Sequence, residues 1–184
     1  MQWGAGAIGH AEWTGVSVKT LLKAAGIRDD AVEVVFEGAD EGVEADYPEP
    51  MRFARSLPLD KALHPDTLIV LRLNGEVLDT NHGYPARLFV PGWYGVASIK
   101  WLQCMQVIDR AFDGYFQTKK YTYEHLAADG PKRTVVGPIV IKSEIVRPQV
   151  GDVRGSGTNR ISGVAWTGEQ PIEAVDISTD GGQT

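Results

Sequence analysis

The sequence predicts an α+β fold, in which a mixed α/β domain is followed by a smaller β-sandwich. Three observations lead to this prediction. Residues 13–27 have the apolar spacing of a helix, and residues 66–78 read as a β-hairpin around an Asn-Gly turn. After Pro138 the chain contains only short alternating strands separated by turn residues. We therefore expect two domains, residues 1–134 and residues 135–184.

The helix expected within residues 13–27 has both ends marked. Thr14 or Ser17 can cap its first turn through a side-chain oxygen, and Gly26 can end it. The expected buried stripe consists of Val18, Leu21, Leu22 and Ala25. A strand over residues 31–38 should follow this helix.

The middle of the chain predicts a loop, a short helix and several strands. The acidic, Pro-containing stretch 39–56 indicates the loop, and residues 58–64 indicate a helix with Asp60 near its start. The further strands are expected within 66–78, 87–92 and 97–108.

The chain changes character after Asp109. Residues 110–124 are polar and aromatic, and residues 125–137 read as a connector because they contain Pro and Gly. The strands that follow are typical of a β-sandwich. Three or four strands leave the edges of such a sheet unpaired, so we expect the second domain to be truncated at its C-terminus.

Composition restricts the classes of function. The chain has 184 residues, of which 43% are hydrophobic and 23% charged, as in globular proteins. A net charge of -6 argues against a nucleic-acid partner, and no apolar run is long enough to span a membrane. The single cysteine, Cys104, excludes an internal disulfide and is expected to be a buried core thiol.

Residues 81–102 carry the strongest chemical signal. Their prolines and glycines form a stiff framework that can expose backbone amides, while imidazole, guanidinium and ammonium groups can hold a phosphate. The candidate binding residues are His82, Arg87, Ser98, Ile99 and Lys100. The alternative interpretation places the cations on solvated strand faces and the tryptophans in the core.

Four stretches of the chain resemble one known family. They are "GAIGHAEWTGV", "FEGAD", "LNGEVLDTNHGYPARLFVPGWYGVASIKWL" and "DGYFQTKKYTYE". Together they resemble the molybdenum-cofactor-binding domain of the sulfite oxidase family, which includes plant-type assimilatory nitrate reductase. The later "GVAWTGEQPIEAVDISTDGGQT" resembles that family's immunoglobulin-like dimerisation domain. The resemblance implies a sulfite-oxidase-type molybdopterin-binding domain followed by a truncated immunoglobulin-like β-sandwich.

The resemblance also implies roles for particular residues. His82 and Arg87 would contact the pterin and its phosphate, and Ser98, Ile99 and Lys100 would line the same pocket, partly through backbone groups. Asp40 would accept hydrogen bonds from the pterin, as a carboxylate can from amino and ring N–H groups. Tyr121 would lie near the molybdenum and act in turnover of the substrate.

The sequence departs from the family pattern in three places. The cysteine that ligates molybdenum in the family lies before "GAIG", and we do not transfer its role to Cys104. Where sulfite oxidases carry an arginine after "AW-G", this chain has Glu169 and Gln170. Lys120 stands where animal sulfite oxidases have an acid. We therefore expect the chain to be an inactive fragment, and sulfite, nitrate and sulfoxide all stay open as substrates.

The sequence thus predicts that the parent protein is a molybdopterin-dependent oxidoreductase. Its molybdenum would transfer an oxo group to or from a small substrate and pass electrons to an acceptor such as a cytochrome or haem domain. The family resemblance implies a homodimer when the protein is full length. The competing hypothesis is a non-catalytic β-rich module that keeps the family scaffold and only associates with other chains.

Overall fold

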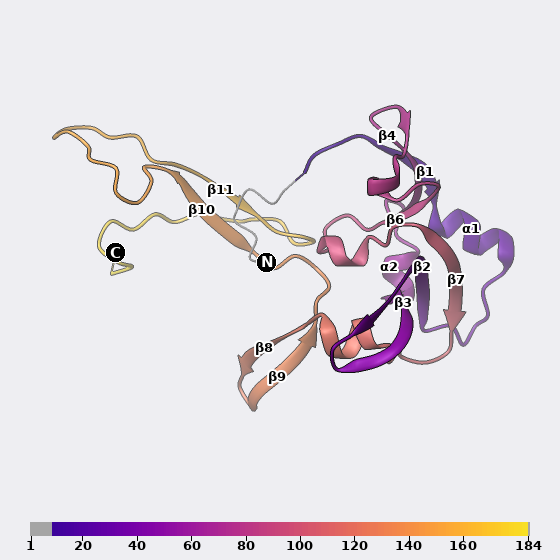
Figure 1. The fold of residues 1–184 in the computed structure, drawn as a ribbon. Coiled ribbons are helices and arrows are strands. Elements are labelled where there is room, and N and C mark those ends of the chain that lie inside the picture. The colour runs from indigo at the N-terminus through magenta and orange to yellow at the C-terminus, as the bar shows by residue number, and fades with distance from the viewer. Residues whose placement is uncertain (1–8, 184) are drawn as a thin grey trace. The chain divides into compact units, whose positions relative to one another are not determined.

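A computed structural model describes residues 9–183, and these form mostly β-strands with a few short helices (Figure 1). The chain divides into two compact units. The first spans His10–Gly137, and the second contains the residues from Pro138 onward. The α+β prediction therefore holds in a form with more strand and less helix than expected.

The first unit begins with a strand and a helix. Trp13–Ser17 forms β1 and Val18–Ala25 forms α1, so the helix is shorter than predicted and Thr14 lies in the strand. The Ser17 side chain caps α1 by accepting the N–H of Thr20, and Gly26 follows the helix at φ +83°. Of the predicted stripe, Val18 and Leu22 are buried whereas Leu21 and Ala25 are exposed.

One sheet of the first unit is centred on β4 (Leu68–Leu73). This strand pairs antiparallel with β1, with β5 (Glu76–Val77) and with β6 (Arg87–Phe89). The predicted hairpin is confirmed: Asn74 and Gly75 join β4 to β5 with φ angles of +51° and +81°. Positive φ at both central residues is the geometry that an Asn-Gly turn favours.

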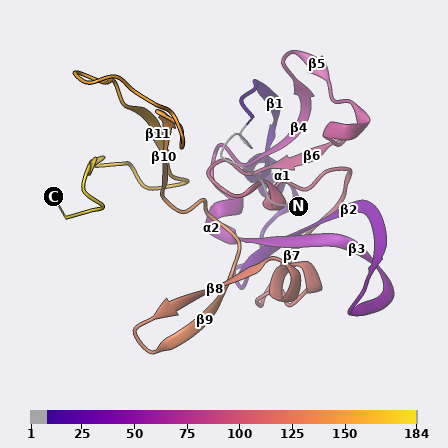
Figure 2. The same cartoon turned by 60° about the vertical axis from the view of Figure 1, so that its left-hand side comes forward.

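The other large sheet has the strand order β3-β2-β7, in which β2 spans Glu33–Glu44, β3 spans Tyr47–Pro58 and β7 spans Leu102–Ile108 (Figure 2). The loop predicted at 39–56 is wrong, because those residues form the outer part of the β2–β3 hairpin. Prolines are tolerated in β3 because it is an edge strand, where a missing N–H breaks no internal ladder.

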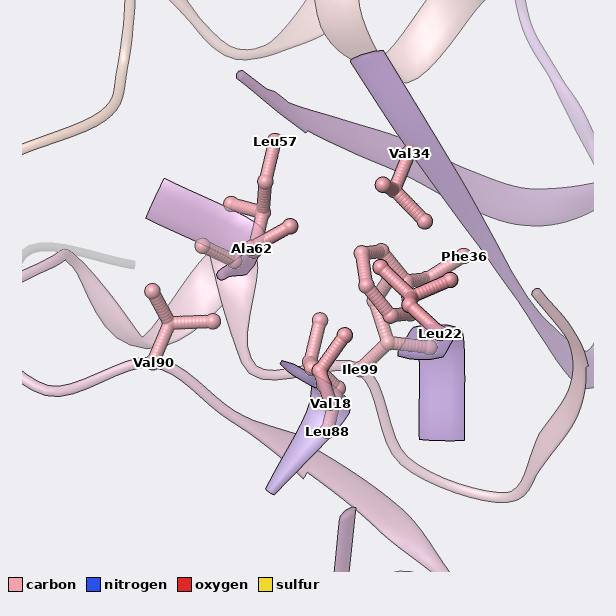
Figure 3. Close-up of a cluster of buried hydrophobic side chains, with 10 residues drawn as sticks. Val18, Leu22, Val34, Phe36, Leu57, Ala62, Leu88, Val90 and Ile99 are labelled. Atoms are coloured by element: carbon pink, nitrogen blue, oxygen red, sulfur yellow. The ribbon is translucent and has the colours of Figure 1, made fainter. Parts of the chain in front are cut away.

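The core of the first unit lies between these sheets and the helices. The short helix α2 (Leu59–Ala62), predicted within 58–64, contributes Ala62 to it. Phe36, Leu22 and Ile99 face one another at its centre (Figure 3). The other buried members are Val18, Val34, Leu57, Leu88, Val90 and Ala97.

Cys104 does not belong to this core. It lies on β7 and is exposed, so the prediction of a buried thiol is wrong. Side chains alternate between the two faces of a strand, and on β7 the neighbouring Met105 and Val107 are the ones packed against the core. The apolar run was read correctly as a strand, but its register turns Cys104 outward.

The remainder of the first unit was predicted to be a polar segment and a connector. It contains instead a π-helix over Phe116–Lys120 and a hairpin of β8 (Thr122–Ala127) with β9 (Gly130–Val135). The connector prediction is wrong, because most of these residues pair in the hairpin. Its proline, Pro131, lies within β9 opposite Leu126. Gly130 adopts φ +115° directly after the turn.

The second unit contains an antiparallel pair, β10 (Lys142–Arg147) with β11 (Ser162–Trp166). Most of its described residues are exposed. The pair agrees with short antiparallel strands, and the immunoglobulin-like sandwich stays a prediction. None of the helices in residues 9–183 is long and apolar enough to cross a membrane.

Candidate functional site

The loop that carries His82 is anchored by Asp79. Asp79 caps the 3₁₀ turn Thr80–His82, because its Oδ1 accepts the His82 N–H at 2.8 Å. Its Oδ2 lies 2.8 Å from Nδ1 of the same histidine. These hydrogen bonds from His82 hold the pKa of Asp79 below its usual range. The imidazole is therefore oriented by a carboxylate while half of its side chain stays exposed.

Arg87 joins this loop to the segment before β7. It donates from one terminal nitrogen to the His82 carbonyl and from the other to the Ser98 carbonyl, each at 3.1 Å. Its Nε is buried and has no hydrogen-bond partner among the described residues. Burial lowers the pKa of the guanidinium, which lies 5.1 Å from the ring centroid of Trp13.

Lys100 approaches the same loop from the other side. Its Nζ donates to the Asn81 carbonyl at 3.1 Å and lies 4.3 Å from the ring centroid of Trp101. Neither Lys100 nor Arg87 forms an ion pair within residues 9–183. Two cations thus converge on the carbonyls of residues 81 and 82, and neither pairs with a carboxylate of the described chain.

Gly83 allows this close approach. It adopts φ +105°, and a Cβ at this position would lie 2.9 Å from Cβ of Lys100 and 3.1 Å from Cβ of Arg87. Only glycine provides both the backbone conformation and the space. The neighbouring Trp101 has a positive φ of +50°, which is rare for a bulky residue. Its Nε1 donates to the Thr80 carbonyl at 2.9 Å, which helps to hold the strained backbone.

Ser98 and Ile99 support the site rather than expose side chains to it. The Ser98 Oγ accepts the N–H of Val90 at 3.1 Å, and the Ile99 carbonyl accepts that of Leu88 at 2.8 Å. The Ile99 side chain is part of the core. Both residues therefore fix β6, which carries Arg87, against the segment that leads to Lys100.

Asp40 lies beside this segment. The register of β2 shifts after Glu37, so the strand bulges where "FEGAD" begins its turn outward. A Cβ at Gly38 would collide with the Asp40 carboxylate and would lie 2.8 Å from the Lys100 carbonyl. The predicted residues Asp40, Ile99 and Lys100 therefore meet around Gly38.

Tyr121 belongs to a second group of residues. Its ring lies 6.1 Å from that of Phe53 and 6.4 Å from that of Phe116, measured between centroids. The guanidinium carbon of Arg55 is 5.8 Å from the same ring. Within the described residues no hydrogen bond or ring contact links Tyr121 to the group around His82.

Sequence reasoning missed Arg55 and Asp79. Arg55 was assigned to a loop, although the stretch "MRFARSLPL" has apolar residues that indicate a strand. Asp79 directly precedes "TNH", and an aspartate before a short turn is a cap signal that was available in the sequence. The Arg55 contacts, in contrast, join residues far apart in the sequence, and such contacts have no fixed spacing along the chain.

The residues around His82 fit a ligand that carries a phosphate. They combine a half-buried guanidinium whose buried Nε–H has no partner among the described residues, an ammonium that forms no ion pair there, and an imidazole. Asp40 adds a carboxylate that can accept from N–H groups of a heterocycle. The set contains both kinds of group that a phosphorylated pterin requires.

Comparisons with known proteins agree with this chemistry. Residues 1–116 match the family model of the oxidoreductase molybdopterin binding domain. The chain is 34% identical over 197 residues to the mitochondrial sulfite oxidase of Drosophila melanogaster, covering 99% of this chain and 33% of that protein. It is 29% identical over 204 residues to a nitrate reductase [NADH] of Ulva prolifera, covering 99% of this chain and 23% of that protein.

A solved structure is similar as well. The sulfane dehydrogenase SoxCD from Paracoccus pantotrophus matches 86% of this chain and 38% of its own, with 34% identity and a TM-score of 0.65. The chain spans 33% of the length of the Drosophila sulfite oxidase that it matches, so it corresponds to one part of such a protein. The chain belongs to the sulfite oxidase family of molybdopterin-binding oxidoreductases.

Proposed function

We propose that the protein containing this chain is a molybdopterin-dependent oxidoreductase and that the residues around His82 hold the phosphate end of its cofactor. The observation that carries this proposal is the convergence of Arg87 and Lys100 on one loop without an anionic partner in the described chain. Two buried or half-buried cations of like sign repel each other, and an anion bound between them would remove that cost.

Each residue of the group has a distinct task in this proposal. Arg87 and Lys100 donate to phosphate oxygens, and His82, oriented by Asp79, adds a third donor. Asp40 accepts N–H groups of the pterin ring. Ser98 and Ile99 contribute through the backbone, because their side chains are committed to Val90 and to the core.

Tyr121 is proposed to act on the substrate. Its phenol can donate to an oxyanion or carry a proton during turnover. The bound cofactor supplies oxo transfer at molybdenum, to or from a small substrate, and its electrons pass to an acceptor such as a cytochrome or haem domain. Sulfite, nitrate and a sulfoxide are the substrates to be tried, since relatives carry the names sulfite oxidase and nitrate reductase.

Residues 135–184 and Cys104 lie outside this site. Residues 135–184 are proposed to belong to an immunoglobulin-like dimerisation domain, supported by the antiparallel β10–β11 pair. Cys104 is not proposed as a metal ligand, because it lies on β7, after "KWL", whereas the family resemblance places the ligating cysteine before "GAIG". We expect this chain alone to retain molybdenum poorly, since it lacks a second cysteine to supply the thiolate.

The test measures molybdenum and pterin in the purified full-length protein. We expect about one of each per chain in the wild type, and Lys100→Met should lower the pterin content at least tenfold, since a charge-assisted contact is worth about 1.5–3 kcal/mol. Lys23→Met, at an exposed position on α1, is the matched control. A full-length protein that contains no pterin would overturn the proposal and favour the non-catalytic association module.

A further inference from the structure

Arg55 is a buried cation with only neutral partners. It lies on β3 with 2% of its surface exposed. One terminal nitrogen donates to the Phe116 carbonyl at 2.8 Å, and the other donates to the Val136 carbonyl at 2.6 Å. Its Nε is buried without a partner among the described residues. No carboxylate in that part of the chain pairs with it, and burial lowers its pKa to about 10.

The two carbonyls that Arg55 binds belong to two segments that are attached to Tyr121, one through the chain and the other through a hydrogen bond. Phe116 begins the π-helix that ends directly before Tyr121. Val136 donates its own N–H to the Tyr121 carbonyl at 2.9 Å. A single guanidinium therefore ties together the segment that precedes Tyr121 and the strand end that pairs with the Tyr121 backbone.

A second hydrogen bond joins β3 to the π-helix, between the residues that directly follow Arg55 and Phe116. Gln117 donates its side-chain N–H to the Ser56 hydroxyl at 3.0 Å, directly after the residues that Arg55 connects. Phe53, two residues before Arg55, meets the rings of Phe116 and Tyr121. The inner part of β3 thus acts as the support on which the Tyr121 segment rests.

At a position that only fills the core, an apolar side chain is less costly to bury than an arginine. A buried guanidinium without a carboxylate carries a large desolvation cost, and an apolar residue of similar volume avoids it. A planar fork that spans two carbonyls, however, sets the distance between two backbone segments more tightly than packing alone. The arginine is therefore placed where geometry matters more than stability.

We propose that Arg55 is a positioning residue that fixes the side chain of Tyr121 for the reaction. The proposal rests on the proposed function in one respect, the role of Tyr121 in turnover. It goes beyond that function because it assigns a role to a residue that does not contact the group around His82. Arg55 is also almost fully shielded from solvent, with 2% of its surface exposed.

The test is a double-mutant cycle in the full-length protein with Arg55→Met, Tyr121→Phe and both changes together. Turnover is measured with sulfite and ferricyanide, and with nitrate and reduced viologen. We expect Arg55→Met to lower kcat by about tenfold or more, with little change in KM, because a small misplacement of a reacting group has effects of this size. Because Arg55 acts through Tyr121, the double variant should be no slower than Tyr121→Phe alone. Effects that multiply would overturn the proposal.

A conservative variant and a matched control complete the kinetic test. Arg55→Lys keeps the charge and can still reach one carbonyl, so it should recover part of the lost kcat. Arg52→Met removes an arginine from the same strand that is half-exposed and paired with Glu37 and Glu41. It should leave kcat within about twofold, as surface changes usually do. Equal losses in Arg52→Met and Arg55→Met would also overturn the proposal.

Hydrogen exchange provides a readout that is independent of activity. Peptides that cover residues 115–137 should exchange faster in Arg55→Met and in Arg55→Lys than in Arg52→Met. The Val136 carbonyl loses the guanidinium that fixes it, so the hydrogen bond from the Val136 N–H to the Tyr121 carbonyl should open more often. Unchanged exchange would overturn the proposal. Pterin content separates the two ideas: a wild type without pterin contradicts the proposed function, whereas normal pterin with unchanged exchange contradicts only the role of Arg55.

Discussion

Arg55 and Arg87 both bind backbone carbonyls, but Arg55 is buried, Arg87 is half-buried, and their neighbours differ. Each donates from both terminal nitrogens to two backbone carbonyls, and each keeps a buried Nε without a partner in the described chain. Each also lies close to an aromatic ring, Tyr121 for one and Trp13 for the other. Burial lowers the pKa of both guanidinium groups.

The two arginines differ in the side chains that surround them. Arg87 and a second cation, Lys100, approach the loop that carries His82, where Gly83 allows close packing, and we propose that this group binds an anion. Arg55 lies with Phe53, Phe116 and Tyr121, and its proposed role is to position the Tyr121 side chain. The presence of His82 and Lys100 beside Arg87 is the reason that we propose a ligand at Arg87 and not at Arg55.

The largest expected effect distinguishes the two arginines by cofactor content. In the full-length protein, Arg87→Met should lower bound pterin at least about tenfold, because a charge-assisted phosphate contact contributes about 1.5–3 kcal/mol. Arg55→Met should keep pterin within about twofold of the wild type, as expected for a site it does not touch. Pterin is measured by fluorescence after oxidative release. Equal losses in both variants would remove the distinction.

The next effect concerns the loop that brings Arg87 and Lys100 together. Gly83→Ala forces a Cβ to within 2.9 Å of Lys100 Cβ at φ +105°, and it should lower the free energy of unfolding by about 1–3 kcal/mol. Gly42→Ala is the control, since a Cβ there meets nothing within 4 Å. Denaturant unfolding of the full-length protein compares the two. A loss as large in Gly42→Ala would show that the loop geometry is not the cause.

A smaller effect follows from the pKa of Arg55, which burial lowers from its ordinary value to about 10. Between this pKa and the higher pKa of the same arginine in the unfolded chain, the unfolded state binds more protons than the folded state, so stability rises with pH. The desolvation cost is fully present below pH 10 and is relieved above it. The free energy of unfolding of the wild type, minus that of Arg55→Met, should therefore rise between pH 9 and pH 11, by at most about 1.4 kcal/mol per pH unit.

The control for this pH dependence is Arg52→Met, whose difference from the wild type should not rise in the same way because Arg52 is half-exposed. A difference for Arg55→Met that stays flat from pH 9 to pH 11 would contradict the buried, unpaired state of Arg55. It would not affect the assignment of Arg87.

The smallest expected effect is at the thiol. Cys104 is exposed on β7, so a thiol reagent should label it in the native protein, and Cys104→Ser should change neither pterin nor molybdenum content measurably. Arg87→Met, with its large loss of pterin, provides the contrast. A loss of molybdenum in Cys104→Ser would reopen this cysteine as a ligand.

Local signals in the sequence predicted the elements whose structure depends on neighbouring residues. The Asn74-Gly75 turn, the Ser17 cap of α1 and the short helix after Pro58 are all confirmed. The long β2–β3 hairpin and the β8–β9 hairpin were missed, because prolines in both suggested loops. A proline is compatible with an edge strand, and sequence alone does not show which strand lies at an edge.

Some features of the candidate site could likewise be predicted from the sequence, whereas others depend on the tertiary structure. Its residue types, a histidine, two cations and a carboxylate near a stiff loop, could be read from the chain together with the family resemblance, because side-chain chemistry is a property of each residue. The exposure of Cys104, the support of Tyr121 by Arg55 and the crowding at Gly83 depend on strand register and on contacts between residues far apart in the chain. Only the tertiary structure decides these, since one step of register turns a side chain from one face of a sheet to the other.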